Sequence, residues 1–197
     1  MRRYNHNIDH DRDCQERDVI PRVGNRVAVF IDGRNVHYRL RELGWPLEYD
    51  VAAFARAITQ HLTLVAVYYY NATPLQRYTK EPDYGRQLRY YALIEGQRDI
   101  VFRKGYLADA GGRLVEKQVD VMLANDMLRG ALKNEYDIAA LVSADADFAT
   151  TVEMIAEEGK RVINFVFRKR RSFNLASVCD EVRYLKRAHF VEMDCSV

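Results

Sequence analysis

Short apolar runs alternate with amphipathic segments along most of the chain. The apolar runs predict strands at 27–31, 64–70, 100–102, 138–142 and 162–167. The other segments have helical spacing, at about 50–61, 84–96, 117–133, 147–158 and 174–186. Continuous rather than alternating apolar runs are typical of strands buried on both faces, as in a parallel sheet. We therefore predict a three-layer α/β fold in which helices cover both faces of a mainly parallel central sheet.

Two stretches break this pattern. Residues 1–25 are polar and carry five arginines and five acids, a composition that buries too little apolar surface to offset the entropy of ordering. We therefore predict a polar N-terminal arm at 1–25, followed by one domain at 26–197. The stretch 73–83 contains Pro74 and Pro82 and predicts a long irregular loop, a type of segment that often has a functional role.

The composition narrows the class of protein. Of the 197 residues, 48% are hydrophobic and 29% are charged, which is ordinary for a globular domain and excludes a fibrous or wholly disordered chain. Three cysteines without a Cys-x-x-Cys pair argue against a disulfide framework or a zinc site. No apolar run approaches the ~20 residues of a membrane span, and no secretory signal follows the N-terminal arginines. These features predict a cytoplasmic protein without a membrane partner.

Acidic residues lie at or just beyond the ends of two of the predicted strands. Asp32 ends the first apolar run and precedes Gly33, while Asp145 and Asp147 follow the fourth run, just after Ser143. In open α/β sheets ligands bind beyond the carboxyl ends of the strands, so these side chains are candidates for a shared site. The alternative is helix capping, because Asp and Ser are favoured at helix N-termini.

The predicted helix at 117–133 contributes a further acid. When Asp120 is placed at the centre of a helical wheel, the apolar side chains of the helix fall within about 100° on either side of it. An isolated carboxylate in an apolar setting must be paired, protonated or bound to a cation. Lys117 is the alternative partner, one turn earlier. Asp126 falls on the opposite, polar side, which favours a solvated surface acid.

Taken together, Asp32, Asp120, Asp145 and Asp147 can converge at one end of the sheet. Such a cluster repels itself unless a cation binds within it. Sites with only carboxylate oxygens favour hard cations such as Mg²⁺ or Mn²⁺. A cation of this kind supports hydrolysis of phosphodiester bonds.

Three motifs in the chain resemble those of the NYN domain, the LabA-like group of the PIN-like nuclease superfamily. They are Ile-Asp-Gly-x-Asn at 31–35, Lys-x-Val-Asp-Val at 117–121 and Leu-Val-Ser-x-Asp-x-Asp-Phe at 141–148. The resemblance implies a PIN-like Rossmannoid fold, bound Mg²⁺ or Mn²⁺, and ribonuclease action on RNA. It assigns the acidic cluster to Asp32, Asp120, Asp145 and Asp147, the polar position after the first acid to Asn35, and supporting positions to Ser143 and Asp126.

Departures from the family pattern leave alternatives open. The family usually has glycine where this chain has Ala144 and Ala146, so either the turn accepts alanine or access to a metal is narrowed. One alternative is therefore a catalytically weak or inactive module that binds RNA or protein. A phosphatase of the haloacid dehalogenase type explains Asp145 and Asp147 but not Asp32. A dinucleotide site lacks its glycine-rich motif.

The net charge of +2 hides an uneven distribution. Residues 160–189 hold nine basic residues against two acids, which gives +7. The run Arg168, Lys169, Arg170 and Arg171 follows the last predicted strand, so we predict that it binds RNA phosphates; a solvated charge run is the alternative. Arginines and tyrosines also interleave over 77–91, where they suit either base stacking or the core. The family fold often forms dimers, so a homodimer is one option.

Overall fold

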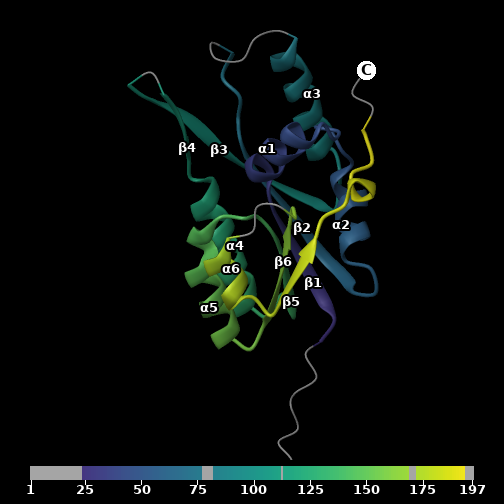
Figure 1. Ribbon diagram of the computed structural model, residues 1–197, viewed down its shortest axis with the longest axis vertical. Coiled ribbons are helices and arrows are strands. Elements are labelled where there is room, and N and C mark those ends of the chain that lie inside the picture. Colours follow the sequence, from purple (N-terminus) through teal and green to yellow (C-terminus); the bar gives the residue numbers. More distant parts are fainter. Residues whose placement is uncertain (1–23, 77–81, 112, 169–171, 194–197) are drawn as a thin grey trace, which may run out of the picture.

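The computed structural model describes residues 24–76, 82–111, 113–168 and 172–193. A seven-stranded sheet has the order β4-β3-β2-β1-β5-β6-β7, with helices on both faces (Figure 1). Six neighbouring strands, from β3 to β7, are parallel, and β4 forms an antiparallel hairpin with β3. The strands are β1 (Arg26–Asp32), β2 (Thr63–Ala72), β3 (Ile100–Ala110), β4 (Arg113–Lys117), β5 (Ile138–Val142), β6 (Arg161–Val166) and β7 (Glu181–Tyr184). The predicted three-layer, mainly parallel α/β fold is confirmed.

Six α-helices lie within the described residues, together with the short 3₁₀ turns η2 and η3. The helices are α1 (Gly33–Leu43), α2 (Val51–Ile58), α3 (Asp83–Glu95), α4 (Val119–Leu132), α5 (Ala149–Glu157) and α6 (Phe173–Val178). The 3₁₀ turns are η2 (Ala146–Phe148) and η3 (Arg187–His189). None of the helices described is long and apolar enough to cross a bilayer. The predicted N-terminal arm is outside the described residues except for its last two positions, as are residues 77–81 of the predicted loop.

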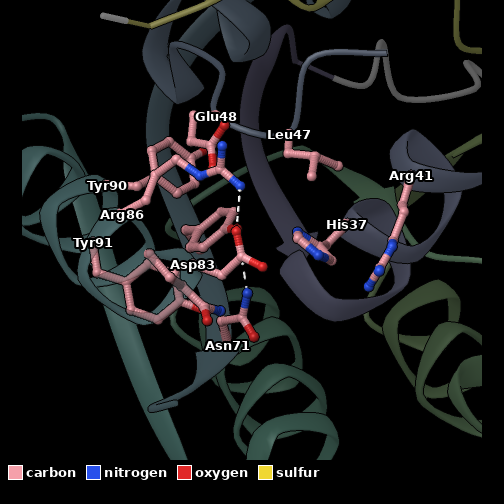
Figure 2. Close-up of a pocket in the computed structure, with 11 residues that line it drawn as sticks. His37, Arg41, Leu47, Glu48, Asn71, Asp83, Arg86, Tyr90 and Tyr91 are labelled. Carbon is pink, nitrogen blue, oxygen red and sulfur yellow. Dashed lines mark hydrogen bonds and ion pairs between the residues drawn. The ribbon is translucent and has the colours of Figure 1, made fainter. Parts of the chain in front are cut away.

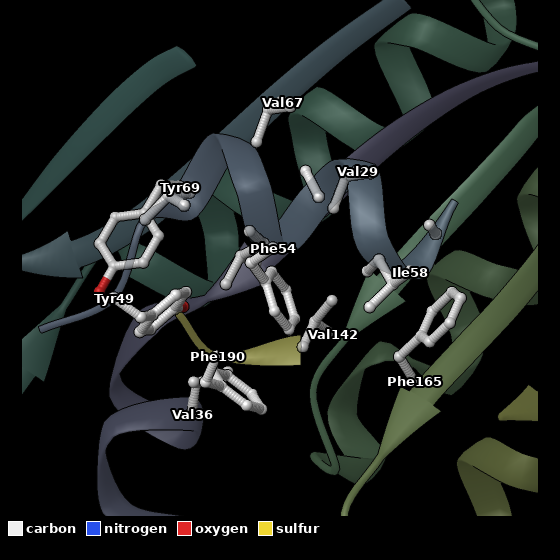
Figure 3. Close-up of a cluster of buried hydrophobic side chains, with 14 of the residues drawn as sticks. Val29, Val36, Tyr49, Phe54, Ile58, Val67, Tyr69, Val142, Phe165 and Phe190 are labelled. Carbon is white, nitrogen blue, oxygen red and sulfur yellow. The ribbon is translucent and has the colours of Figure 1, made fainter. Parts of the chain in front are cut away.

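Both faces of the sheet are packed, which explains the continuous apolar runs. On β1, Val27, Val29 and Ile31 face α1, α2 and α3, whereas Ala28 and Phe30 face α4, α5 and α6. The C-terminal segment closes the first face, because the Phe190 ring stacks on Phe54 at 4.8 Å between centroids (Figure 3).

Two strands, β4 and β7, were not predicted from the sequence, and one predicted helix is longer than the helix in the structure. The segment 174–186 was expected to be helical throughout, but α6 ends at Val178 and β7 follows at Glu181–Tyr184. The parallel edge of β6 pairs with this segment, and Asp180 accepts a hydrogen bond from the Val162 N–H at 2.8 Å. Similarly, β3 extends to Ala110 because β4 pairs with its outer half.

The pairing of β1 with β5 positions the site. Their register joins Val27 to Ile138 and Ile31 to Val142, so both strands end level with each other. At their opposite ends, Arg26 binds Asp137 in a two-pronged ion pair, with Nη2–Oδ1 at 2.8 Å and Nε–Oδ2 at 3.0 Å. Bidentate pairs of this kind fix orientation as well as attract.

Gly33 is required where β1 turns into α1. A Cβ atom at this position would lie 2.6 Å from the Tyr70 carbonyl oxygen and 2.7 Å from the Tyr69 ring. We expect Gly33→Ala to lower the free energy of unfolding by about 1–3 kcal/mol, the usual cost of overpacking, as measured by urea denaturation.

Gly96→Ala is the matched control for this substitution. Gly96 has right-handed helical backbone angles, and its added Cβ would meet atoms no closer than 3.5 Å. We expect its stability to be unchanged or raised by up to about 1 kcal/mol. Equal stabilities of the two variants would show that the turn at Gly33 is not tightly packed.

Candidate active site

Asp32 is a buried carboxylate at the end of β1 and the N-cap of α1. It is only 5% exposed. Its Oδ1 accepts the backbone N–H of Asn35 at 2.9 Å, and its Oδ2 accepts the Ser143 hydroxyl at 2.8 Å. The positive end of the α1 dipole favours an ionised group at this position. Asp32 is therefore both the expected strand-end acid and a helix cap.

Ser143 and Asn164 hold the end of β5 against β1. The buried Ser143 hydroxyl donates to Asp32 and accepts the Asp145 backbone N–H at 3.2 Å. Asn164 on β6 is 1% exposed, and its Nδ2 donates to the Ser143 carbonyl at 2.9 Å and the Leu141 carbonyl at 3.2 Å. Sequence reasoning missed Asn164, although an amide inside an otherwise apolar run was a usable signal.

The turn after β5 accepts alanine without strain. Asp145 caps η2, because its Oδ1 accepts the Asp147 backbone N–H at 3.0 Å. Neither Ala144 nor Ala146 has a positive φ, so the glycines usual at these positions are not needed for the backbone here. The buried ring of Phe148 anchors the turn.

Asp120 lies in the first turn of α4, where the charges of other acids act on it. Its pKa is raised by partial burial, and further by the negative charges of Asp145 and Asp147, while the nearby positive charge of Arg34 opposes the shift. Like charges that raise the pKa of a carboxyl group must lie close to it. The structure therefore brings Asp120, Asp145 and Asp147 into one electrostatic neighbourhood beyond the carboxyl end of β5.

The environment of Asp120 differs from the expectation in two ways. The helical wheel predicted an enclosed carboxylate, but Asp120 is only partly shielded and stays exposed to solvent, because α4 begins only one residue before it. Lys117 was the expected alternative partner, whereas the cation that acts on Asp120 is Arg34. Gln118, the N-cap of α4, has a φ of 74°, a left-handed conformation that is strained for a residue with a side chain.

Asn35 and Asp126 have different positions. Asn35 is half-buried in the first turn of α1, and its backbone N–H binds Asp32. Asp126 lies two turns along α4 from Asp120, where its carboxylate pairs with Arg103 at 3.1 Å and Arg129 at 3.2 Å. It also accepts the Tyr70 hydroxyl at 3.1 Å. These contacts make Asp126 part of an ion-pair network that joins α4 to β2 and β3.

The basic residues are only partly described. Arg168 is exposed and lies over the Tyr184 ring, with its guanidinium carbon 5.5 Å from the ring centroid, while Lys169, Arg170 and Arg171 are outside the described residues. In the 77–91 stretch, Tyr90 and Tyr91 are buried in the core. Arg34 was not predicted, although it lies inside the first motif.

The side chains of the cluster are of the type that binds a hard cation, but the described residues show no preformed metal site. The clustered groups are carboxylate oxygens, which Mg²⁺ and Mn²⁺ prefer, and their mutual repulsion would be relieved by positive charge. Among the residues that the structure describes, however, no group of three or more His, Cys, Asp or Glu side chains is placed to hold a metal ion. The predicted four-carboxylate metal site stays a prediction.

The raised pKa of Asp120 has a measurable consequence. A carboxyl group with a raised pKa binds its proton more readily in the folded than in the unfolded state, so the fold loses stability as pH rises through that pKa. Asp120→Asn removes this loss. We expect the variant to gain stability relative to wild type as pH rises from about 4, the ordinary range of Asp, to 7, by no more than about 1 kcal/mol because solvent screens the charges.

Urea unfolding at both pH values measures this difference. Asp99→Asn is the control, because Asp99 is exposed and precedes β3, at the end of the sheet where the parallel strands begin. It removes the same charge away from Asp145 and Asp147, so it corrects for the general effect of removing one carboxylate. A pH-independent difference for Asp120→Asn would contradict the proximity of the three acids.

Comparisons with known proteins agree with this fold and these motifs. The NYN domain matches residues 26–186. A crystal structure of a protein of unknown function from Vibrio parahaemolyticus aligns with a TM-score of 0.62 and 22% sequence identity, covering 86% of this chain and 97% of that one. At this identity the likeness shows the fold alone. The search of curated proteins found no match. Because the match spans most of its length, the chain belongs to the NYN domain family, a branch of the PIN-like nuclease superfamily.

Proposed function

We propose that the protein is a metal-dependent ribonuclease that hydrolyses RNA phosphodiester bonds with the help of a carboxylate-bound Mg²⁺ or Mn²⁺. The observation that carries this proposal is the electrostatic cluster of Asp120, Asp145 and Asp147 beside the buried Asp32. Gathering negative charge at one edge of a sheet is unfavourable by itself. Such an arrangement is typical of sites that bind a cation.

The four carboxylates would share the cation with solvent and substrate. Mg²⁺ is usually held by one or two carboxylates, several waters and substrate phosphates rather than by a closed protein cage. This mode of binding is compatible with the described residues, which lack a ready three-ligand group. A bound cation would neutralise a phosphate and make a coordinated water more acidic.

The side chains of the site have separate roles in this proposal. Ser143 and the N-terminus of α1 fix both oxygens of Asp32, so this carboxylate is preorganised. Arg34, whose charge acts on Asp120, would contact a phosphate of the RNA. The half-buried side chain of Asn35 would orient water or substrate.

RNA is the proposed substrate because the family is nucleolytic and the chain carries basic residues near the carboxyl ends of the strands. Arg168 lies two residues after the end of β6 and is exposed. Together with Lys169, Arg170 and Arg171 it would neutralise phosphates and give salt-dependent affinity. A module that binds RNA without cleaving it is the second candidate, because no three-ligand metal group is found among the described residues.

Substitution of the acids distinguishes the two candidates. We expect Asp32→Asn and Asp145→Asn to lower the rate of RNA cleavage in Mn²⁺ by about 100-fold or more, the usual effect of removing one group that stabilises charge in an active site. Asp99→Asn, at the end of the sheet where the parallel strands begin, should cleave at the wild-type rate. The measurement is the cleavage rate of a labelled single-stranded RNA at saturating protein.

Two outcomes would contradict the proposal. If the two site variants cleave as fast as wild type, the acids are not the active site. If wild-type protein binds the RNA equally well in Ca²⁺ and Mn²⁺ but never cleaves it, the protein is a binding module.

A further inference from the structure

Two adjoining cavities open at the end of the sheet where the acids gather. The larger, of about 260 Å³, lies between α1 and α3, with His37 and Arg41 on one side and Tyr90 and Tyr91 on the other (Figure 2). The smaller, of about 140 Å³, shares three of its lining residues and also reaches Arg34. Because Arg34 lies on α1 only two residues after Asp32, the two cavities form a path that leads away from the acidic cluster.

The larger cavity is balanced in charge. It is lined by two cations, Arg41 and Arg86, and by two anions, Glu48 and Asp83. Arg86 is already paired with both anions, at 2.7 Å from Asp83 and 3.4 Å from Glu48. A phosphate would therefore gain little inside this cavity and would meet two carboxylates. The charge pattern favours an uncharged, polar ligand group.

Burial keeps the imidazole ring of His37, which also lines the larger cavity, neutral. The pKa of His37 is lowered chiefly by burial, and the opposing charge of Glu48 only partly offsets this. At neutral pH the imidazole is therefore an uncharged planar ring that faces the cavity. Planar rings of this kind are common stacking partners of unpaired bases.

Two amide side chains, shared by both cavities, offer a donor beside an acceptor. Asn71 at the end of β2 is 9% exposed, and its Nδ2 makes one long hydrogen bond of 3.4 Å to Tyr69, so a second N–H is left to donate. Gln87 on α3 donates through Nε2 to Tyr91 at 2.9 Å, which leaves its Oε1 as an acceptor. A donor next to an acceptor is what the pairing edge of a nucleobase can match.

We infer that the larger cavity binds one unpaired base of a single-stranded RNA, while the phosphate of that nucleotide lies at Arg34 beside the acids. The cavity volume is just below the roughly 300–1,000 Å³ of sites for drug-sized ligands, so it suits one base rather than two. A base in a duplex could not enter it. The inference rests on the proposed function only in taking RNA as the ligand.

Removing the base from one nucleotide of an RNA at a time tests this inference. The probe is a labelled single strand of about eight nucleotides, within the range that one single-strand site covers, together with a series in which one nucleotide at a time lacks its base. Binding is measured with the full chain in Ca²⁺. We expect one abasic position to weaken wild-type binding about 10-fold, the usual contribution of a stacked base, and the other positions to matter less.

Variants at Gln87 test whether the base at the critical RNA position binds in the larger cavity. Gln87→Ala and Gln87→Leu, of which the second keeps the volume, should bind the intact RNA more weakly and no longer distinguish it from the critical abasic strand. Leu88→Ala is the matched control, because Leu88 is 39% exposed on the same helix and lines neither cavity; it should keep the wild-type difference. Thermal melting checks that all three variants fold.

The outcomes separate this inference from the proposed function. It is overturned if no single abasic position matters, if both Gln87 variants keep the full difference, or if the RNA does not bind. Cleavage in Mn²⁺ without a base-dependent position would overturn the base site and leave the ribonuclease proposal standing. A base-dependent position in RNA that is never cleaved would support the base site and contradict the nuclease.

Discussion

The parallel pairing of β1 with β5 is the constraint on which the site depends. The ion pair between Arg26 and Asp137 joins the two strands where they begin, and an even register carries them to the same level at Ile31 and Val142. The next residue of β1 is Asp32, and the residue after β5 is Ser143, so their side chains meet across the strand ends at 2.8 Å. A one-residue shift in this register would turn Asp32 to the other face of the sheet.

The site concentrates features that oppose stability. Asp32 is a buried carboxylate, Asp120 carries repulsion from two neighbouring acids, and Gln118 has a left-handed backbone conformation. The two cores that enclose the sheet on both faces supply the stability that this edge lacks. Local departures of this kind are expected where a protein is built to bind or react rather than to be maximally stable.

The features that could be predicted from the sequence are those set by residues that are close together in the chain. An apolar run followed within three residues by an acid located the ends of β1 and β5, because both signals lie close together in the sequence. By contrast, β4 and β7 form only because a neighbouring strand offers its edge. The exposure of Asp120 depends on where α4 begins, and a helical wheel does not show where a helix begins. Arg34 and the cavity beside His37 act through tertiary neighbours, so sequence spacing alone could not assign them, whereas the amide of Asn164 inside an apolar run was a signal that the prediction did not use.

The central claim is that the acids beyond β1 and β5 bind a divalent cation. Paramagnetic Mn²⁺ broadens NMR signals of nearby nuclei, so a titration of the RNA-free protein, followed by backbone amide signals, tests this claim most directly. We predict that the first signals to broaden are those of residues 32–35, 120 and 143–147, and that excess Mg²⁺ restores them by competition. Broadening centred on the ion-pair network of Asp126, Arg103 and Arg129, or spread evenly over the protein, would contradict the claim.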